Sequence, residues 1–332
     1  MLRAPDVASI DLGHSSVKVS FLNQDGVKRR EMFRSVVTPS FPISDETEAA
    51  RAAAETVVVG GRSYFFGSTA ETQGGAAVAT GLSEDWIETP EYMALMLGAL
   101  KKMKSKGCPE PLAMVVMGLP THVYSRYKER LKELAAPYFG GAEIKIVPQP
   151  LGAYQRVMLE DMGKPSIGHS MTTESIGIVE IGYFSSDFML MQSGRWVEKA
   201  SGTCSGVRVA AEHLMRILSD KRGITADLGE CEQALQSKHI KSFGKRLDVE
   251  SEVRQALSIL ESEVVDVATR LMEPYARKLD GIVVAGGGAP FVFEQLKQKW
   301  AHAVLPDDHR FAVAEGMRRF GLAILRSREF PA

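Results

Sequence analysis

An acidic residue, a glycine, two small hydroxyl residues and a lysine lie close together near the N-terminus, in the segment Asp11-Leu12-Gly13-His14-Ser15-Ser16-Val17-Lys18. β-type runs at Val7 to Ile10 and Val17 to Leu22 flank it, so we predict a hairpin with the motif at its turn. Such a turn can aim backbone N–H groups at phosphate oxygens, while Lys18 adds positive charge and Asp11 holds magnesium-bound water. An ordinary hairpin with a polar tip has the same residues, so this motif alone does not decide the function.

A second segment repeats this arrangement in the middle of the chain, at Glu180-Ile181-Gly182-Tyr183-Phe184-Ser185-Ser186-Asp187. It places an acid, a glycine and small hydroxyl residues between a strand at Ile176 to Ile181 and its hairpin partner at Phe188 to Gln192. Two such turns facing each other could clamp phosphates from both sides and hold one metal ion between two carboxylates. A plain β-hairpin is the alternative for this segment, and the repeat of the first turn favours the phosphate site.

A third motif is an apolar, parallel-type strand that runs into three glycines just ahead of a helix, at Ile282-Val283-Val284-Ala285-Gly286-Gly287-Gly288-Ala289. Glycine lets the backbone approach a ligand closely, and the N-terminus of the following helix favours an anion. Three glycines alone are also typical of a flexible loop. The motif gains its meaning from being the third part, in order, after the two turns.

These motifs need strands and helices to position them, and the order of parts in the first half of the chain recurs from about Ser175 onward, which indicates an internal repeat. We expect the segment from Val36 to Arg51, with its two prolines and several acids, to be a loop. The remaining strands are predicted at Thr56 to Val59, Tyr64 to Phe66, Leu112 to Met117 and Ile144 to Val147. Helices are predicted at Pro90 to Lys106, Tyr124 to Ala136, Leu151 to Met162, Gly206 to Ser219, Ala226 to Gln236, Glu250 to Met272 and Ala314 to Arg328.

Composition limits the classes of protein to consider. The 332 residues, 45% of them hydrophobic, favour two domains with real cores. The formal net charge is -1 and charges of both signs are spread along the chain, so we expect no direct binding of nucleic acid. The three cysteines fit no disulfide framework or metal spacing, and no long apolar run occurs. We therefore expect a cytoplasmic protein that does not bind membranes.

Taken in order, the three motifs resemble the first phosphate, second phosphate and adenosine motifs of the actin, chaperone and sugar-kinase superfamily. Within it the chain is similar to the ParM/StbA plasmid-segregation proteins, through Val58 to Phe66 with Gly67, Asp85-Trp86 before the helix at Tyr92, and Gly118-Leu119-Pro120. The resemblance implies an α/β, actin-like (ribonuclease H-like) fold with duplicated domains and an ATP cleft between them. It implies domain I at 1–163 with a small subdomain at about 30–90, domain II at 164–313, and a C-terminal helix at 314–332 that returns to domain I.

The resemblance also implies roles for single residues. Asp11 would organise Mg²⁺ and its waters, and Lys18 would reach a phosphate oxygen. The remaining residues of the first turn that would face the β- and γ-phosphates are Gly13, Ser15 and Ser16. The contacts from the second domain would come from Gly182 and Ser185 to the phosphates, and from Gly286, Gly287 and Gly288 to the adenosine, with Glu315 and Gly316 resembling a second connecting segment.

Gln149 and Glu180 complete the expected catalytic set with Asp11. Gln149 resembles the position that orients the attacking water, since an amide positions water by donating and accepting hydrogen bonds. Glu180 would hold the metal through water, and it departs from the family pattern, which has Asp. The bulky Tyr183 and Phe184 depart from it as well, since the family has small residues after Gly182.

These roles imply an ATPase that binds ATP or ADP with Mg²⁺ and joins with copies of itself, head to tail, into filaments that segregate plasmid DNA. DNA would be reached through a separate DNA-binding adaptor protein. The rival interpretations are a sugar-kinase-like phosphotransferase, for which we find no convincing catalytic aspartate, and a non-polymerising, ATP-binding scaffold linked to membranes through the C-terminal helix. A chaperone is disfavoured, because no substrate-binding domain follows the glycine strand.

Overall fold

The computed structural model describes residues 6–75 and 85–329. The expected ends of the chain at residues 1–5 and 330–332, and residues 76–84 of the expected small subdomain, lie outside the described residues. The chain divides into two compact units, unit 1 at Met1–Ser170 with Phe311–Ala332 and unit 2 at Met171–Arg310. The domain boundaries that the resemblance implies are at 163/164 and 313/314.

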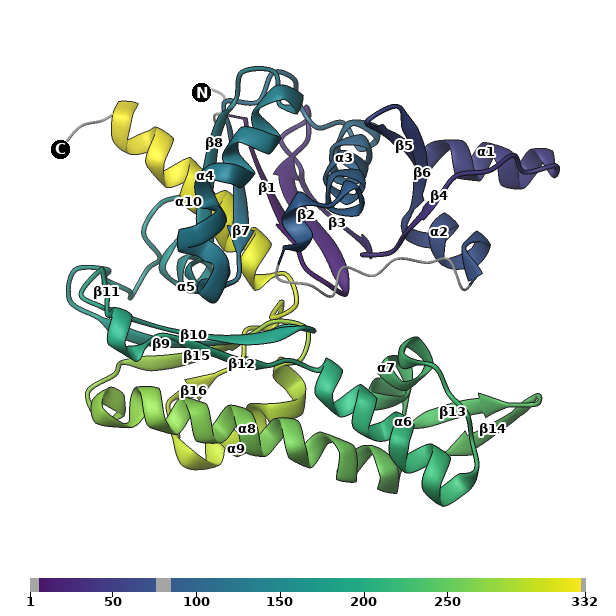
Figure 1. Cartoon of the computed structure of the whole chain (residues 1–332). Coiled ribbons are helices and arrows are strands. Elements are labelled where there is room, and N and C mark those ends of the chain that lie inside the picture. Colours follow the sequence, from purple (N-terminus) through teal and green to yellow (C-terminus); the bar gives the residue numbers. More distant parts are fainter. Residues whose placement is uncertain (1–5, 76–84, 330–332) are drawn as a thin grey trace. The chain divides into compact units, whose positions relative to one another are not determined.

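Unit 1 is built on a five-stranded mixed sheet whose strand order is β3-β2-β1-β7-β8 (Figure 1). The first three strands form an antiparallel meander, and β7 and β8 continue the sheet parallel to β1. Their bounds are β1 Val7–Leu12, β2 Ser16–Leu22, β3 Lys28–Arg34, β7 Met114–Leu119 and β8 Glu143–Pro148. The predicted strands at 7–10, 17–22, 112–117 and 144–147 are therefore confirmed.

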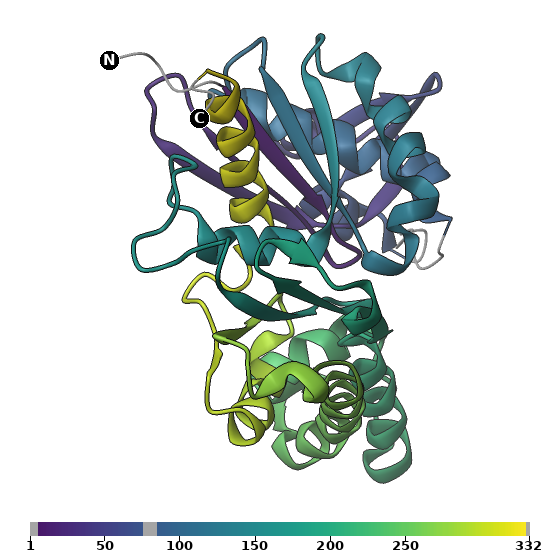
Figure 2. The same ribbon diagram turned by 90° about the vertical axis from the view of Figure 1, so that its left-hand side faces the viewer.

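Alternation along β1 decides what each of its faces contacts. Ala8, Ile10 and Leu12 join the buried cluster that includes residues of α3 (Pro90–Ser105) and α4 (Thr121–Ala135). Ser9 points the other way, and its hydroxyl donates to the carbonyl of Ala314 on α10 (Ala312–Glu329). Figure 2 shows α10, in yellow, lying along the sheet of unit 1. Asp11 shares the face of Ser9.

A second small sheet in unit 1 has the order β4-β6-β5, with β4 Val37–Pro39, β5 Thr56–Val59 and β6 Arg62–Phe66. The predicted hairpin at 56–66 is confirmed, but the loop predicted from Val36 to Arg51 is wrong. That segment holds β4 and the helix α1 (Glu46–Ala54), and α2 (Gly67–Gln73) follows β6. α1 begins there because the Asp45 side chain accepts from the backbone N–H of Glu48, an N-cap that the prolines upstream do not disturb.

The helix predicted from Leu151 to Met162 begins earlier and ends earlier, as α5 at Gln149–Met158. Pro150 lies in its first turn, where the missing backbone N–H costs no hydrogen bond. The segment Pro148-Gln149-Pro150 is therefore the end of a strand and the start of a helix. This places the Gln149 side chain at a helix N-terminus.

Unit 2 repeats the plan of the large sheet, with the order β11-β10-β9-β15-β16 and with β12 paired to β10. β9 and β10 are antiparallel, while β15 and β16 continue in parallel. Their bounds are β9 Ser175–Ile181, β10 Ser185–Gln192, β11 Arg195–Trp196, β12 Gly202–Ser205, β15 Gly281–Ala285 and β16 Ala303–Val304. A meander followed by parallel strands thus occurs in both units, as the internal repeat predicts.

The helices of unit 2 are α6 Arg208–Arg222, α7 Leu228–Ser237, α8 Glu250–Ala276 and α9 Ala289–Lys299, and a hairpin of β13 His239–Ser242 and β14 Lys245–Asp248 separates α7 from α8. Val179 and Ile181 of β9 lie in the core cluster with α6 and α8, so Glu180 between them lies on the opposite face. Across the part of the chain that the structure describes, no helix has the length and apolar character needed to span a bilayer.

Candidate functional site

The Asp11 carboxylate is the centre of the first turn. Asp11 lies opposite Lys18 in the β1–β2 ladder, and Lys18 Nζ donates to Asp11 Oδ2 at 3.1 Å. Gln149 Nε2 donates to Asp11 Oδ1 at 2.8 Å. Asp11 is only 4% exposed. Each of its carboxylate oxygens therefore has a hydrogen-bond partner from the protein, although the side chain is almost fully buried. The structure therefore brings together three residues that the sequence assigned to the site.

Gln149 reaches Asp11 because β7 leaves room for its side chain. Gly118 on β7 has no side chain, and a Cβ there would lie 2.8 Å from Gln149 Cγ. Gln149 uses its amide N–H on Asp11, and no partner for its amide oxygen occurs among the described residues. The amide is therefore fixed at one end and able to accept a hydrogen bond at the other.

The backbone of the first turn is braced from outside the hairpin. Ser35, which follows β3, donates its hydroxyl to the Gly13 carbonyl and its N–H to the Ser15 carbonyl at 2.9 Å. The His14 ring stacks on Trp86 with the centroids 4.4 Å apart. Ser35 and Trp86 lie outside the motif in sequence, and no role at the turn was predicted for either of them. The turn enters the site in a fixed shape, with Ser15 part-exposed and Ser16 buried.

The second turn has the same backbone plan but different charges. The Gly182 N–H donates to the Ser185 carbonyl at 2.9 Å, and the Ser185 hydroxyl donates to Asp187 Oδ2 at 2.8 Å. Thr203 on β12 donates to Asp187 Oδ1 at 3.0 Å. Asp187 stands opposite Glu180 in the β9–β10 ladder, so two acids occupy the places that Asp11 and Lys18 occupy in unit 1.

The glycines after β15 lie directly beside the second turn. Ala285 pairs with Glu180, and Gly286 has φ +94°. A Cβ at Gly286 would lie 2.3 Å from the Ile181 carbonyl oxygen and 2.5 Å from Glu180 Oε1, which leaves space only for glycine. A Cβ at Gly287 would meet nothing within 4 Å. Within unit 2 the structure thus places the second and third motifs in contact.

Glu315 and Gly316 have partners inside unit 1. Glu315 is fully buried, accepts from the Ser20 hydroxyl at 3.1 Å and forms an ion pair with Arg318 at 3.2 Å. A Cβ at Gly316 would lie 1.7 Å from the Gly152 carbonyl oxygen, so the backbones of α10 and α5 touch at this point. Both residues hold α10 against the rest of unit 1, and their place in a connecting segment of the nucleotide site stays a prediction.

The cysteines of this chain are poor candidates for nucleophilic residues. The three cysteines are free. Burial, helped by neighbouring carboxylates, raises the pKa of Cys108 and of Cys204 to about 12 and the pKa of Cys231 to about 11. Thiols with such pKa values are protonated at neutral pH and are poor nucleophiles. Among the residues described, no three side chains of His, Cys, Asp or Glu gather as a ready metal site.

Comparisons with known families match the two units in turn. Residues 9–152 match the family described as actin like proteins, N terminal domain. Residues 178–298 match the family described as archaeal actin homologue MreB-like, C-terminal. A search of the curated proteins finds no match to the chain.

Solved structures share the fold over nearly the whole chain at low identity. A 15-stranded ParM filament from Clostridium botulinum is 18% identical, with a TM-score of 0.75 and coverage of 96% of this chain and 99% of that one. Ta0583, an archaeal actin homolog in complex with ADP, is 17% identical, with a TM-score of 0.73 and coverage of 97% and 100%. MreB5 of Spiroplasma citri bound to ADP is 17% identical, with a TM-score of 0.70 and coverage of 98% and 99%. Two actin-like family models match the two units in order, and solved actin-like structures align over nearly the whole chain, so the chain has the two-domain α/β fold of the actin-like proteins.

Proposed function

We propose that this chain is an ATPase that binds ATP with Mg²⁺ and assembles with copies of itself into filaments. The observation that carries the proposal is the buried Asp11 carboxylate, held between Lys18 and Gln149 at 3.1 and 2.8 Å. A buried carboxylate beside a lysine and an amide, at the turn of a hairpin, suits a nucleotide's phosphates and their metal. Two of the similar structures contain ADP, and one is a filament.

The donor set near Asp11 fits Mg²⁺ bound through water. Mg²⁺ retains several waters and needs only one or two carboxylates when phosphates supply other oxygens. Each Asp11 oxygen accepts one hydrogen bond and keeps a second lone pair for a metal-bound water. When bound, the ion would neutralise charge on the phosphates. Lys18 would add a positive charge there, and Glu180 is proposed as the matching acid of unit 2.

Gln149 is proposed to orient the attacking water. Its amide nitrogen is held by Asp11, which leaves the amide oxygen as an acceptor for a water proton. Gln149→Ala should therefore lower ATP turnover about 10²-fold, since one positioned hydrogen-bonding group contributes about that much, while ATP affinity changes less than about threefold. Steady-state phosphate release and calorimetric titration measure the two quantities, and Gln236→Ala on the exposed face of α7 is the control. An equal loss of affinity and turnover would contradict this role.

We propose plasmid segregation as the setting of these filaments, with DNA reached through a DNA-binding adaptor protein. The support is the likeness to ParM filaments and the net charge of -1, which gives the chain no general attraction to DNA. Pulldown of plasmid DNA with and without a candidate adaptor tests this step. Tight binding of DNA by the purified chain alone would contradict it.

The proposal is tested first by light scattering and pelleting of the purified chain with Mg²⁺ and ATP, ADP or GTP. We expect scattering to rise with ATP, and Asp11→Ala to abolish the rise and lower ATP turnover about 10²-fold or more. Asp220→Ala, an exposed acid on α6, should behave like the original chain. ATP binding with no assembly at any protein concentration would favour the scaffold, and phosphate transfer to a sugar would favour the phosphotransferase.

A further inference from the structure

The turn of the β13–β14 hairpin carries a residue that its backbone disfavours. Phe243 and Gly244 form a two-residue loop, with φ values of +45° and +81°. Positive φ at both central positions is the pattern of a type I′ turn, in which Asn-Gly is preferred and a bulky residue at the first position is strained. Phe243 is also completely exposed, at 103%. The Phe243 side chain is therefore not part of the core of unit 2, and its backbone conformation is unfavourable for a bulky residue.

Three positively charged residues lie within three positions of Phe243 in the hairpin. Lys241 stands directly opposite Arg246 in the β13–β14 ladder, and Lys245 follows the turn. All three are exposed, and none has an acidic partner within 4.0 Å among the described residues. Like charges directly opposite each other on neighbouring strands destabilise a hairpin. The tip therefore combines an exposed aromatic ring with three cations that have no acidic partner in the described part of the chain.

Unit 1 carries an apolar groove on its small subdomain. Phe41, Ile43 and Phe65 line it together with Ala49 and Ala53 of α1, and its volume is about 420 Å³. Phe41 is 46% exposed and meets Phe65 edge to face, with the centroids 5.4 Å apart. Aromatic rings pack favourably in such edge and offset arrangements. The groove has the size and the chemistry to accept one further aromatic side chain.

One end of this groove is acidic. Glu46 and Asp45 are exposed at the start of α1, and Glu46 lies three and seven residues before Ala49 and Ala53, on the same helix face. Lys101 at the groove donates to the carbonyls of Ala53 and Thr56, so its charge caps the end of α1. No cation pairs with Glu46 within the described part of the chain.

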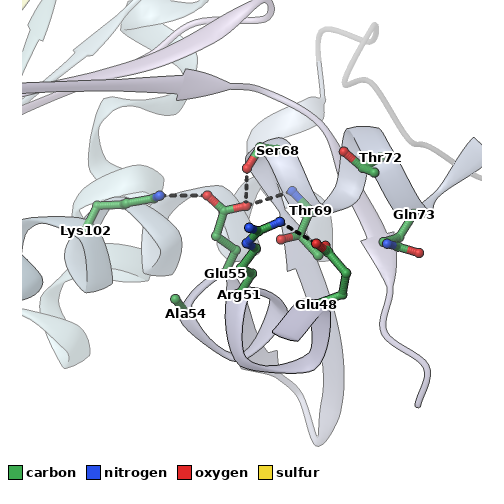
Figure 3. Close-up of a pocket in the computed structure, with 9 residues that line it drawn as sticks. All are labelled: Glu48, Arg51, Ala54, Glu55, Ser68, Thr69, Thr72, Gln73 and Lys102. Atoms are coloured by element: carbon green, nitrogen blue, oxygen red, sulfur yellow. Dashed lines mark hydrogen bonds and ion pairs between the residues drawn. The ribbon is translucent and has the colours of Figure 1, made fainter. Parts of the chain in front are cut away.

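The opposite side of α1 differs, as Figure 3 shows. There Glu48 and Arg51 pair with each other, and the Glu55 carboxylate accepts from Lys102, Ser68 and Thr69. The charges of this second pocket are matched within the chain. The groove side of α1 presents apolar walls beside Glu46, an acid with no ion-pair partner among the described residues, and this combination complements the β13–β14 tip.

We propose that the β13–β14 tip of one copy inserts Phe243 into the apolar groove of another copy, with Lys241, Lys245 and Arg246 beside Glu46 and Asp45. An apolar knob and its pocket on different parts of one surface make a contact that can be repeated from copy to copy. This proposal rests on the proposed assembly of the chain into filaments. It identifies the β13–β14 tip and the apolar groove as the two surfaces that meet between copies.

The first test replaces Phe243 with the residue that the turn prefers. Phe243→Asn should keep or raise the melting temperature, because Asn-Gly suits a type I′ turn, and it should raise the critical concentration for ATP-dependent pelleting about tenfold or more. Ile167→Ser, at another exposed apolar position (92% exposed), should leave assembly unchanged. If wild-type chain assembles and Phe243→Asn assembles equally well, the contact is overturned while filament formation stands.

The second test asks whether the contact joins two chains. Lys241→Glu/Arg246→Glu alone and Glu46→Lys alone should each assemble several-fold less well than wild type. An equal mixture should recover assembly, because each tip then meets a complementary groove on the other variant. Arg254→Glu/Lys278→Glu, with two exposed cations of unit 2 reversed outside the tip, is the control for the change of charge and should assemble as well as wild type on its own.

Absence of recovery in the mixture would overturn the contact, even if each variant were impaired. The contact is also overturned if Phe243→Asn loses binding to vesicles with anionic lipid while its assembly is unchanged, because the tip would then serve a membrane surface. A wild-type chain that stays monomeric with every nucleotide overturns the proposed assembly itself. These outcomes separate failure of the contact from failure of the filament proposal.

Discussion

The two strand-turn-strand motifs of this chain share a backbone but differ in what stabilises them. A Cβ at Gly13 would lie 3.0 Å from the Ser16 carbonyl oxygen, and one at Gly182 would lie 2.8 Å from the Ser185 carbonyl oxygen. In both turns, therefore, the glycine lies close to the carbonyl oxygen of the serine three residues later. The duplication seen in strand order extends to the geometry of single residues.

Charge separates the two turns. In unit 1 an acid faces a base, Asp11 opposite Lys18, whereas in unit 2 Glu180 faces Asp187. Unit 2 instead packs the glycines after β15 against its turn, at distances that leave no space for a side chain at Gly286. We infer that the turn of unit 1 acts mainly through its charged side chains, and that the turn of unit 2 acts mainly through close packing of its backbone against the glycines after β15.

The largest expected effect comes from filling the crowded glycine of unit 2. Gly286→Ala places a Cβ against the Ile181 carbonyl at a positive φ, and should cost about 3 kcal/mol or more of folding free energy. Gly287→Ala, with open space around it, should cost less than about 1 kcal/mol. Urea unfolding followed by circular dichroism measures both. Equal stability of the two variants would contradict the close-packed reading of unit 2.

A smaller effect is expected from removing the charge that distinguishes unit 1. Lys18→Met should weaken ATP binding about tenfold to a hundredfold, because it deletes a charge-assisted contact worth about 1.5–3 kcal/mol. Asp187→Asn, at the equivalent place in unit 2, should weaken binding less than about threefold, because it removes negative charge and retains an oxygen for its hydroxyl partners. Calorimetric titration with ATP measures both affinities. The division of roles is wrong if Asp187→Asn has the larger effect.

The sequence predicted the parts of this comparison that depend on local pattern. Strand runs, the helix predicted from Pro90 and the order of the three motifs are local signals, and the structure has them in place. The hydrogen bond from Gln149 to Asp11 joins residues 138 apart, and no local pattern could show it. The same holds for the Ser35 brace, which depends on where β3 ends.

Two further features show why the remainder escaped prediction. α1 was missed because its cap, Asp45, lies close after Pro39 and Pro42, whose presence favours a loop. Glu315 was assigned to a ligand by resemblance, whereas burial and its partner Arg318 depend on how α10 packs. Sequence pattern locates elements and motifs, while the partner of a buried polar group is decided by tertiary packing.

The smallest expected effect concerns Tyr92, which contacts Trp86 beneath the first turn. Burial, with the negative charge of Asp11 adding to it, raises the pKa of Tyr92 far above its ordinary value of 10.0. The folded chain keeps this proton where the unfolded chain loses it, so the contribution to stability is full below about pH 10 and falls at higher pH. The buried hydroxyl also has no hydrogen-bond partner among the described residues, so Tyr92→Phe should be neutral or stabilising by up to about 1 kcal/mol at pH 7.5, with a larger gain at pH 10.5. Urea unfolding at the two pH values measures this, with the exposed Tyr138→Phe as control. A gain that shrinks at pH 10.5 would mean that Asp11 and burial do not hold the Tyr92 proton, and that the charge of unit 1 reaches less far beneath its turn than we infer.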